Sequence, residues 1–178
     1  MISAMYDQIH SALATLDHLA ETWGALALFA IVALEAIGAP VPGESGVIAA
    51  SLMALRGDLS IIHVVIAAFL GAVLGDSIGY FIGRRYGTAI LDRFGHRIGL
   101  TAERRRDFES RYQSHGTYVV ATARFVVVLR QLNGLLAGAN KMPYRRFLAA
   151  DLVGAAAWTL VWGLGPYFFG DLFKGLGL

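Results

Sequence analysis

Cysteine is absent from this chain of 178 residues, and charged side chains are scarce. The lack of cysteine excludes disulfide bridges, thiolate metal sites and cysteine nucleophiles. Only 16% of the residues are charged and 56% are hydrophobic, whereas about 25% of residues are charged in a typical soluble domain. The five histidines show none of the spacings of metal ligands, so we expect no metal and no other cofactor. The composition predicts a membrane protein, and nothing in it indicates a nucleic-acid partner.

Positive charge is missing from the first part of the chain, which has no Lys or Arg before Arg56. Between Arg84 and His115, by contrast, there are eight arginines and four acidic residues. Loops rich in Lys and Arg stay on the cytoplasmic side of a membrane. This segment is therefore predicted to be cytoplasmic and both termini to lie outside. The N-terminus lacks a basic region followed by a short apolar run, so no cleavable signal peptide is expected.

Two apolar runs, Ile61–Ile82 and Phe147–Phe169, are long enough to cross a membrane, because a spanning helix needs about 20 residues. The N-terminal stretch from Ile2 to Trp23 repeats apolar residues at helical spacing among polar ones. It predicts an amphipathic helix on the membrane surface, and the arginine-rich segment predicts further interfacial helices.

Two other apolar runs, Trp23–Leu34 and Val47–Leu55, are too short to span. They flank an interruption that contains Pro40, Pro42 and Gly43, residues that break helices and form turns. This pattern predicts a re-entrant hairpin with the three residues at its tip. Irregular backbone is tolerated at membrane depth only where protein or a water-filled cavity covers it.

The apolar stretch Tyr118–Ala139 predicts a second hairpin, since it is interrupted by polar residues, namely Arg124, Arg130, Gln131 and Asn133. Asn133 and Gly134 are turn formers, and we expect Gly134 at the tip of this hairpin.

The chain also repeats itself, because "GYFIG" at Gly79–Gly83 resembles "PYFFG" at Pro166–Gly170, 87 residues later. Each half then consists of one hairpin followed by one spanning helix, and a single crossing per half inverts the second half relative to the first. The predicted fold is an all-α polytopic membrane protein built as an inverted repeat of two re-entrant hairpins, each followed by a transmembrane helix, with additional interfacial amphipathic helices. The single domain covers residues 1–178 and divides into a first repeat (about 23–87), a cytoplasmic amphipathic linker (about 88–116) and a second repeat (about 117–170).

Hairpins that enter from opposite faces bring their tips together. We expect Glu35 and Glu44 to lie near Arg124 and Arg130, because ionisable groups inside a membrane are acceptable when they are paired or hydrated and usually have a function.

Three stretches resemble the signature sequences of the DedA family, also called the VTT or SNARE-associated membrane proteins, in the same order and spacing: "EAIGAPVPGES", "GAVLGDSIGYFIGRRYG" and "ARFVVVLRQLNGLLAG". The resemblance implies two opposed re-entrant hairpins in a bacterial inner membrane, movement of lipids across the bilayer and dependence on the proton motive force. It also implies that the essential acidic pair is Glu35 and Glu44 and that the essential arginines are Arg124 and Arg130. Many members have a proline after the second arginine and a final transmembrane helix, neither of which is seen here.

The residue types suggest roles. An arginine fork offers several donors in one plane and stays charged, so Arg124 and Arg130 are the predicted phosphate ligands, with Gln131 and Asn133 beside them. The candidates for proton coupling are the carboxylates, namely Glu35, Glu44 and, as a secondary candidate, Asp76. Simple charge balance between the arginines and the glutamates is the alternative.

Asp76 and Tyr80 lie four residues apart on one helix face, so a structural hydrogen bond between them is an equal possibility. Glycines recur every four residues, at Gly71, Gly75, Gly79 and Gly83, and this stripe predicts close helix packing and no ligand.

The predicted function is that of a flippase for a phosphate-bearing lipid, first of all undecaprenyl phosphate, coupled to protons. A flippase or scramblase of phospholipids such as phosphatidylethanolamine, and a proton-coupled transporter of small cations, are the alternatives. An enzyme is not expected, because a phosphatase would need a nucleophile and neither hairpin contains histidine. The expected partners are the lipid and protons, and homo-oligomers are possible.

Overall fold

The computed structural model describes residues 23–94 and 115–175, and every regular element within these ranges is a helix. The predicted N-terminal amphipathic helix and most of the arginine-rich linker lie outside the described residues. The helices are Trp23–Ile37, α2 (Gly43–Arg56), α3 (Ile61–Phe94), a helix over 115–123, α5 (Val127–Ala139), α6 (Tyr144–Thr159), the π-helix η2 (Leu160–Leu164) and α7 (Gly165–Gly175).

Two helices long and apolar enough to cross a membrane are present among the described residues, where the two spans were predicted. They cover Ile61–Gly87 and Tyr144–Gly170, with 27 residues each. A helix of that length measures about 40 Å, more than the roughly 30 Å of a bilayer's hydrocarbon core. The first of them continues to Phe94 without a break, past the point where the linker was expected to begin.

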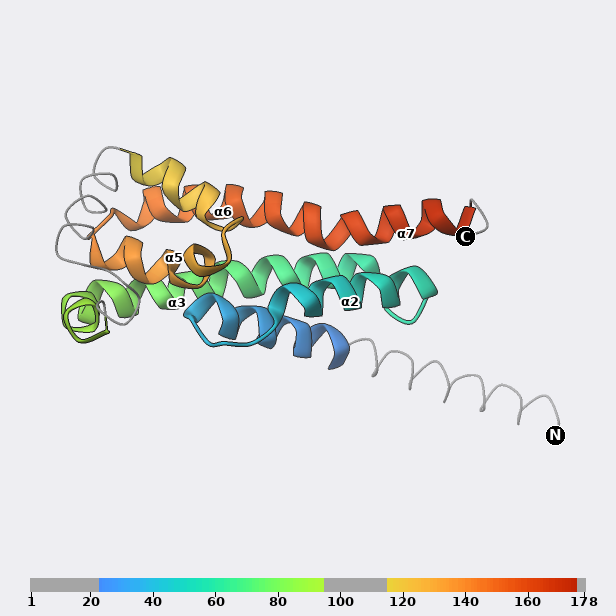
Figure 1. Ribbon diagram of the computed structural model, residues 1–178, viewed down its shortest axis with the longest axis horizontal. Helices are drawn as coiled ribbons and strands as arrows, with labels where there is room; N and C mark the ends of the chain where they lie inside the picture. The colour runs from blue at the N-terminus through green and yellow to red at the C-terminus, as the bar shows by residue number, and fades with distance from the viewer. Residues whose placement is uncertain (1–22, 95–114, 176–178) are drawn as a thin grey trace, which may run out of the picture.

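Two helical hairpins lie alongside these long helices and point toward each other (Figure 1). The first hairpin consists of Trp23–Ile37, the loop 38–42 and α2. The second hairpin consists of the helix over 115–123, the turn 124–126 and α5. Each opens at a different end of the molecule, and their turns meet near its middle (Figure 1).

The turn of the second hairpin was predicted wrongly. It lies at 124–126, where Val126 is extended (φ −115°, ψ 116°), whereas Asn133 and Gly134 are inside α5. A Cβ on Gly134 would collide with the carbonyl oxygen of Asp76. Gly134 therefore allows α5 to pack closely against α3. The prediction that it forms a turn was wrong.

The glycine stripe of α3 packs as predicted. A Cβ on Gly71 would lie 2.6 Å from the carbonyl oxygen of Phe29 in the first hairpin, and one on Gly83 would collide with the carbonyl oxygen of Leu135 in α5. Both hairpins thus lie directly on the backbone of α3, which glycine alone permits because it has no Cβ.

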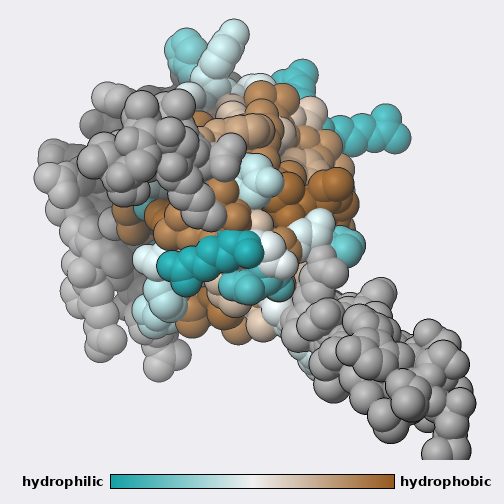
Figure 2. Space-filling model, turned by 90° about the vertical axis from the view of Figure 1, so that its right-hand side faces the viewer, coloured by the Kyte–Doolittle hydropathy of each residue, from teal (hydrophilic) through white to brown (hydrophobic). Residues whose placement is uncertain are grey.

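A second face of α3, about 100° around the helix from the glycine stripe, carries a row of exposed hydrophobic side chains at Ile62, Ile66, Leu70, Leu74, Ile78 and Phe81. Hydrophobic residues also cover much of the described surface seen from the end of the molecule (Figure 2). A continuous apolar face of this kind suits contact with lipid chains.

We predict that Gly83→Ala destabilises the protein by about 1–3 kcal/mol, the usual cost of overpacking, because the new methyl group would collide with Leu135. Gly79→Ala, one turn earlier on α3, is the matched control, since its Cβ would find only ordinary contacts at 3.5 Å and beyond. Thermal unfolding of the purified variants in detergent measures the difference. Equal melting temperatures for the two variants would contradict the packing of α5 on α3.

Candidate functional site

One cluster of charges forms where the two hairpin turns meet, and we call it the Arg130 cluster. Arg130, near the start of α5, donates from Nη1 to Glu44 Oε2 at 2.5 Å and from Nη2 to Glu35 Oε1 at 2.8 Å. Its guanidinium carbon lies 5.3 Å from the ring centroid of Trp158 on α6. Arg130 and Glu35 are buried, whereas the side chain of Glu44 keeps 31% of its surface exposed. The cluster is therefore reachable from its Glu44 side.

Gly43, predicted as a tip residue, makes room for this cluster. It is buried at the first position of α2, and a Cβ there would collide with the Glu35 carboxylate. Pro42 precedes it as the N-cap, and Pro40 and Pro42 are exposed in the loop. These residues end one helix, start the next and leave space for Glu35 to reach Arg130.

A second cluster, the Arg124 cluster, lies deeper in the protein. Arg124 occupies the turn of the second hairpin and donates from Nη2 both to Asp151 Oδ1 on α6, at 2.8 Å, and to Asp76 Oδ2 on α3. The side chains of all three residues are at most 2% exposed. This cluster fastens the hairpin turn to both long helices.

The structure thus divides the charges that were expected in one group. Glu35 and Glu44 pair with Arg130, while Arg124 pairs with Asp76 and with Asp151. Asp151 was missed, although an acidic residue inside the apolar run Phe147–Phe169 is itself a signal of a buried ionic site.

The other candidates take different places. Asn133 is buried and donates to the carbonyl oxygen of Val120 at 3.3 Å, which ties the two arms of the second hairpin together. Gln131 is half-buried, and its backbone carbonyl oxygen faces the turn glycine Gly38 of the first hairpin. Neither side chain contacts Arg130 in the hydrogen bonds of the described residues.

The suggested hydrogen bond between Asp76 and Tyr80 is not the one formed. The Tyr80 hydroxyl donates to the carbonyl oxygen of Met142 and accepts from Arg84 Nη1 at 3.2 Å. Its ring stacks on Phe147 with centroids 4.8 Å apart. Tyr80 therefore joins α3 to the start of α6, and Asp76 is left to bind Arg124.

Each cluster has one positive and two negative groups when all are ionised. Buried ion pairs are stable only if the geometry compensates for the lost hydration. Arg130 has a carboxylate on each terminal nitrogen and an aromatic face, and one of its carboxylates reaches solvent. This arrangement can exchange a carboxylate for another anion, whereas the closed Arg124 cluster cannot do so without opening.

The chain is similar to known proteins over most of its length. The family model of the VTT domain matches residues 41–168. These residues include every member of both clusters except Glu35. An uncharacterized membrane protein of Synechocystis is 38% identical over 159 residues, covering 89% of this chain and 73% of the relative.

Two further relatives are matched over less of their length. An uncharacterized membrane protein of Mycobacterium tuberculosis is 43% identical over 142 residues, covering 75% of this chain and 63% of the relative. Protein DedA of Escherichia coli K12 is 31% identical over 134 residues, covering 74% and 61%. No solved structure matches.

We predict that Arg124→Ala lowers stability by about 3–5 kcal/mol, because it leaves the buried side chains of Asp76 and Asp151 without their positive partner, and that Arg130→Ala costs less, because Glu44 can be hydrated. Arg145→Ala, at an exposed position of α6, is the control and should leave stability unchanged. Thermal unfolding in detergent compares the three. A larger loss for Arg130→Ala than for Arg124→Ala would refute this ranking.

Proposed function

Since the chain belongs to the VTT domain family, also called the DedA family, we propose that this membrane protein moves a phosphate-bearing lipid from one leaflet of the bilayer to the other. Undecaprenyl phosphate is the first candidate, and a phospholipid such as phosphatidylethanolamine is the alternative. The protein acts as a proton-coupled transporter and not as an enzyme.

The position of Arg130 carries this proposal. Its guanidinium lies where the hairpin turns meet, and Glu44, bound to one of its terminal nitrogens, is partly exposed. A phosphate monoester offers the same oxygen acceptors as a carboxylate and binds an arginine fork strongly. The lipid phosphate can therefore replace Glu44 on Nη1 while Glu35 stays on Nη2.

This exchange couples binding to protons. An ionised Glu44 competes with the phosphate for Arg130, whereas a protonated Glu44 is neutral and releases it. A proton taken up by Glu44 thus accompanies phosphate binding, and loss of the proton returns Glu44 to Arg130 and expels the phosphate. Gln131 lies next to Arg130 in the chain and is a secondary candidate for contact with the headgroup.

The arrangement of the hairpins supports this mechanism. Two helical hairpins that open at opposite ends and meet near the middle (Figure 1) are what an inverted repeat of re-entrant hairpins would produce. Inverted repeats place the transport site at their interface near the bilayer midplane. On this proposal the Arg130 cluster is that site, and small movements of the hairpins open it to one leaflet at a time.

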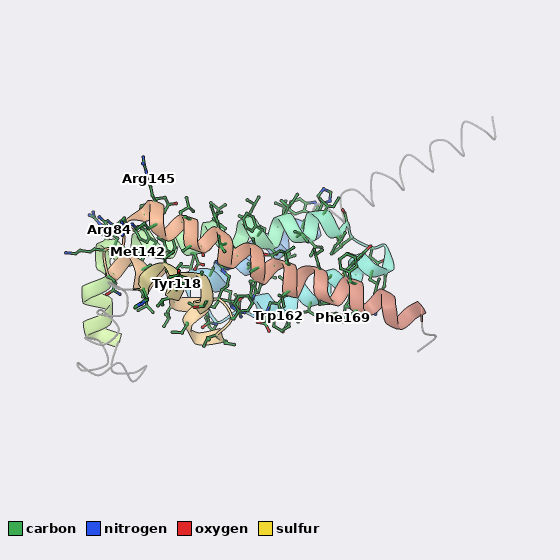
Figure 3. The ribbon with its side chains drawn as sticks, turned by 90° about the horizontal axis from the view of Figure 1, so that it is seen from above. Arg84, Tyr118, Met142, Arg145, Trp162 and Phe169 are labelled. Carbon is green, nitrogen blue, oxygen red and sulfur yellow. The ribbon has the colours of Figure 1, made fainter. Side chains whose placement is uncertain are left out.

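The charges support an orientation in the cytoplasmic membrane. Arg84 and Arg145 lie at one end of the molecule (Figure 3), and further exposed basic residues adjoin them in the chain at Arg85, Lys141 and Arg146. We propose that this end faces the cytoplasm and that the opposite end, where Trp23–Ile37 begins and α7 ends, faces outward.

A proton-coupled transporter of small cations is the second candidate, and one observation favours it. The Arg130 cluster contains one more carboxylate than it has positive groups, and the excess negative charge could bind a cation. Under this alternative the arginine only balances charge.

We predict that the purified protein in liposomes transports a tagged phosphate lipid and that Arg130→Lys reduces the rate roughly tenfold or more. Lysine keeps the charge and loses the fork, and a lost hydrogen bond to a charged group costs about 1.5–3 kcal/mol. Glu44→Gln should transport without response to a pH gradient, because the amide cannot take up the proton. Asp58→Asn, which changes an exposed carboxylate outside both clusters, is the control.

The outcomes separate the candidates. If no lipid class moves faster than in protein-free vesicles and a cation moves instead, the cation transporter replaces the flippase. If Arg130→Lys transports lipid at the normal rate, charge balance is the role of Arg130.

A further prediction concerns orientation. The chain has no cysteine, so single cysteines at Lys141 and Asp58, both exposed and at opposite ends of the long helices, report their side without background. A membrane-impermeant thiol reagent added to intact cells should label position 58 and leave position 141 unlabelled until the cells are opened. The reverse pattern would invert the proposed orientation.

A further inference from the structure

The Arg124 cluster has a feature that the proposed transport cycle does not use. Asp76 and Asp151 both accept a hydrogen bond from the same nitrogen, Nη2 of Arg124. Two carboxylates that share one nitrogen are close neighbours. Asp76 and Asp151 have 0% of their surface exposed, and Arg124 has 2%, so water does not screen one carboxylate from the other.

The charges around this cluster do not balance. Arg124 supplies one positive charge, and the two aspartates would supply two negative ones. Three elements pack around Asp76: the hairpin turn contributes Arg124, α6 contributes Asp151, and α5 contributes an uncharged backbone group at Gly134. The neighbouring Arg130 cluster also has one carboxylate in excess. No described residue therefore supplies a second positive charge.

The atoms of the cluster that lack hydrogen-bond partners also indicate an excess of negative charge. Asp76 Oδ1 and Asp151 Oδ2 are buried and have no hydrogen-bond partner among the described residues. A buried carboxylate that is both ionised and incompletely hydrogen-bonded is very unfavourable, and two like charges at this separation cannot both be maintained without water. One proton on either aspartate removes the excess charge and leaves one carboxylate for Arg124.

We propose that the Arg124 cluster binds one resident proton at neutral pH, held jointly by Asp76 and Asp151. The site is then neutral. Arg124 fastens the second hairpin to α3 and α6 through one ion pair and one hydrogen bond to a neutral carboxyl group. This proton differs from the one assigned to Glu44, since Glu44 reaches solvent and the aspartates do not. The proposal does not depend on what the protein transports.

Infrared spectroscopy tests the proposal directly, because a protonated carboxyl has a C=O stretching band that an ionised one lacks and that shifts in D2O. The full chain is measured in lipid nanodiscs at neutral pH, and the spectra of Asp76→Asn and Asp151→Asn are subtracted from that of the unmodified protein. Each difference spectrum should show the loss of one such band, because the remaining aspartate then pairs with Arg124 one to one and ionises. Asp58→Asn, at an exposed position, should show no loss.

Three results would overturn the proposal. If neither aspartate variant loses a band, both carboxylates are ionised and another cation balances them. If only one variant loses it, removing one aspartate does not ionise the other, and the proposed charge balance is wrong. If the band disappears in Asp58→Asn as well, it does not come from this cluster. Size-exclusion chromatography verifies folding, and Asp151→Asn alone still decides whether a proton is present if Asp76→Asn does not fold.

Discussion

A charge buried among hydrocarbon needs an opposite charge beside it, and the described part of this protein is arranged around that requirement. Arg124 and Arg130 belong to one hairpin, yet their carboxylate partners come from the other hairpin, from α3 and from α6. Hydrocarbon cannot solvate a guanidinium, so each arginine holds distant segments together. The two ionic clusters therefore explain both why the hairpin turns meet and why the long helices stay beside them.

Close backbone packing makes these pairs possible. Apolar side chains give little driving force for helix association in lipid, where the surroundings are equally apolar, and contact between backbones contributes instead. Gly75 and Gly83 of α3 lie directly against the two hairpins, and Gly134 of α5 lies against the carbonyl group of Asp76. With a larger residue at Gly134, the second hairpin would move away from α3 and Arg124 would lose its reach to Asp76.

The two arginines are both buried, but their carboxylate partners differ in solvent access, and so the two clusters differ in what they can do. Arg124 is enclosed by two fully buried aspartates, which makes it a structural anchor. Arg130 has a partner that is 31% exposed, so an ion from outside can compete for it. Ligand exchange needs such an accessible, replaceable partner, while stability favours a closed one. The π-helix Leu160–Leu164 begins two residues after Trp158, whose ring lies under Arg130, and π-helical turns often occur at functional sites.

The sequence alone determined the class of protein, the family and the two helices long enough to span, because these depend on composition, run length and short motifs, which are local properties. It also identified both arginines, both glutamates and Asp76 as charges that a membrane accepts only when they are paired or hydrated. Only the tertiary structure decided which charges pair. Arg130 and Glu35 are 95 residues apart in the chain, and no periodicity encodes such a distance. The same limit explains two errors: Gly134 was taken for a turn residue, and Asp151 was missed. Whether a glycine forms a turn or packs against another helix depends on its neighbours in the folded protein. The same is true of whether a single aspartate pairs with an arginine.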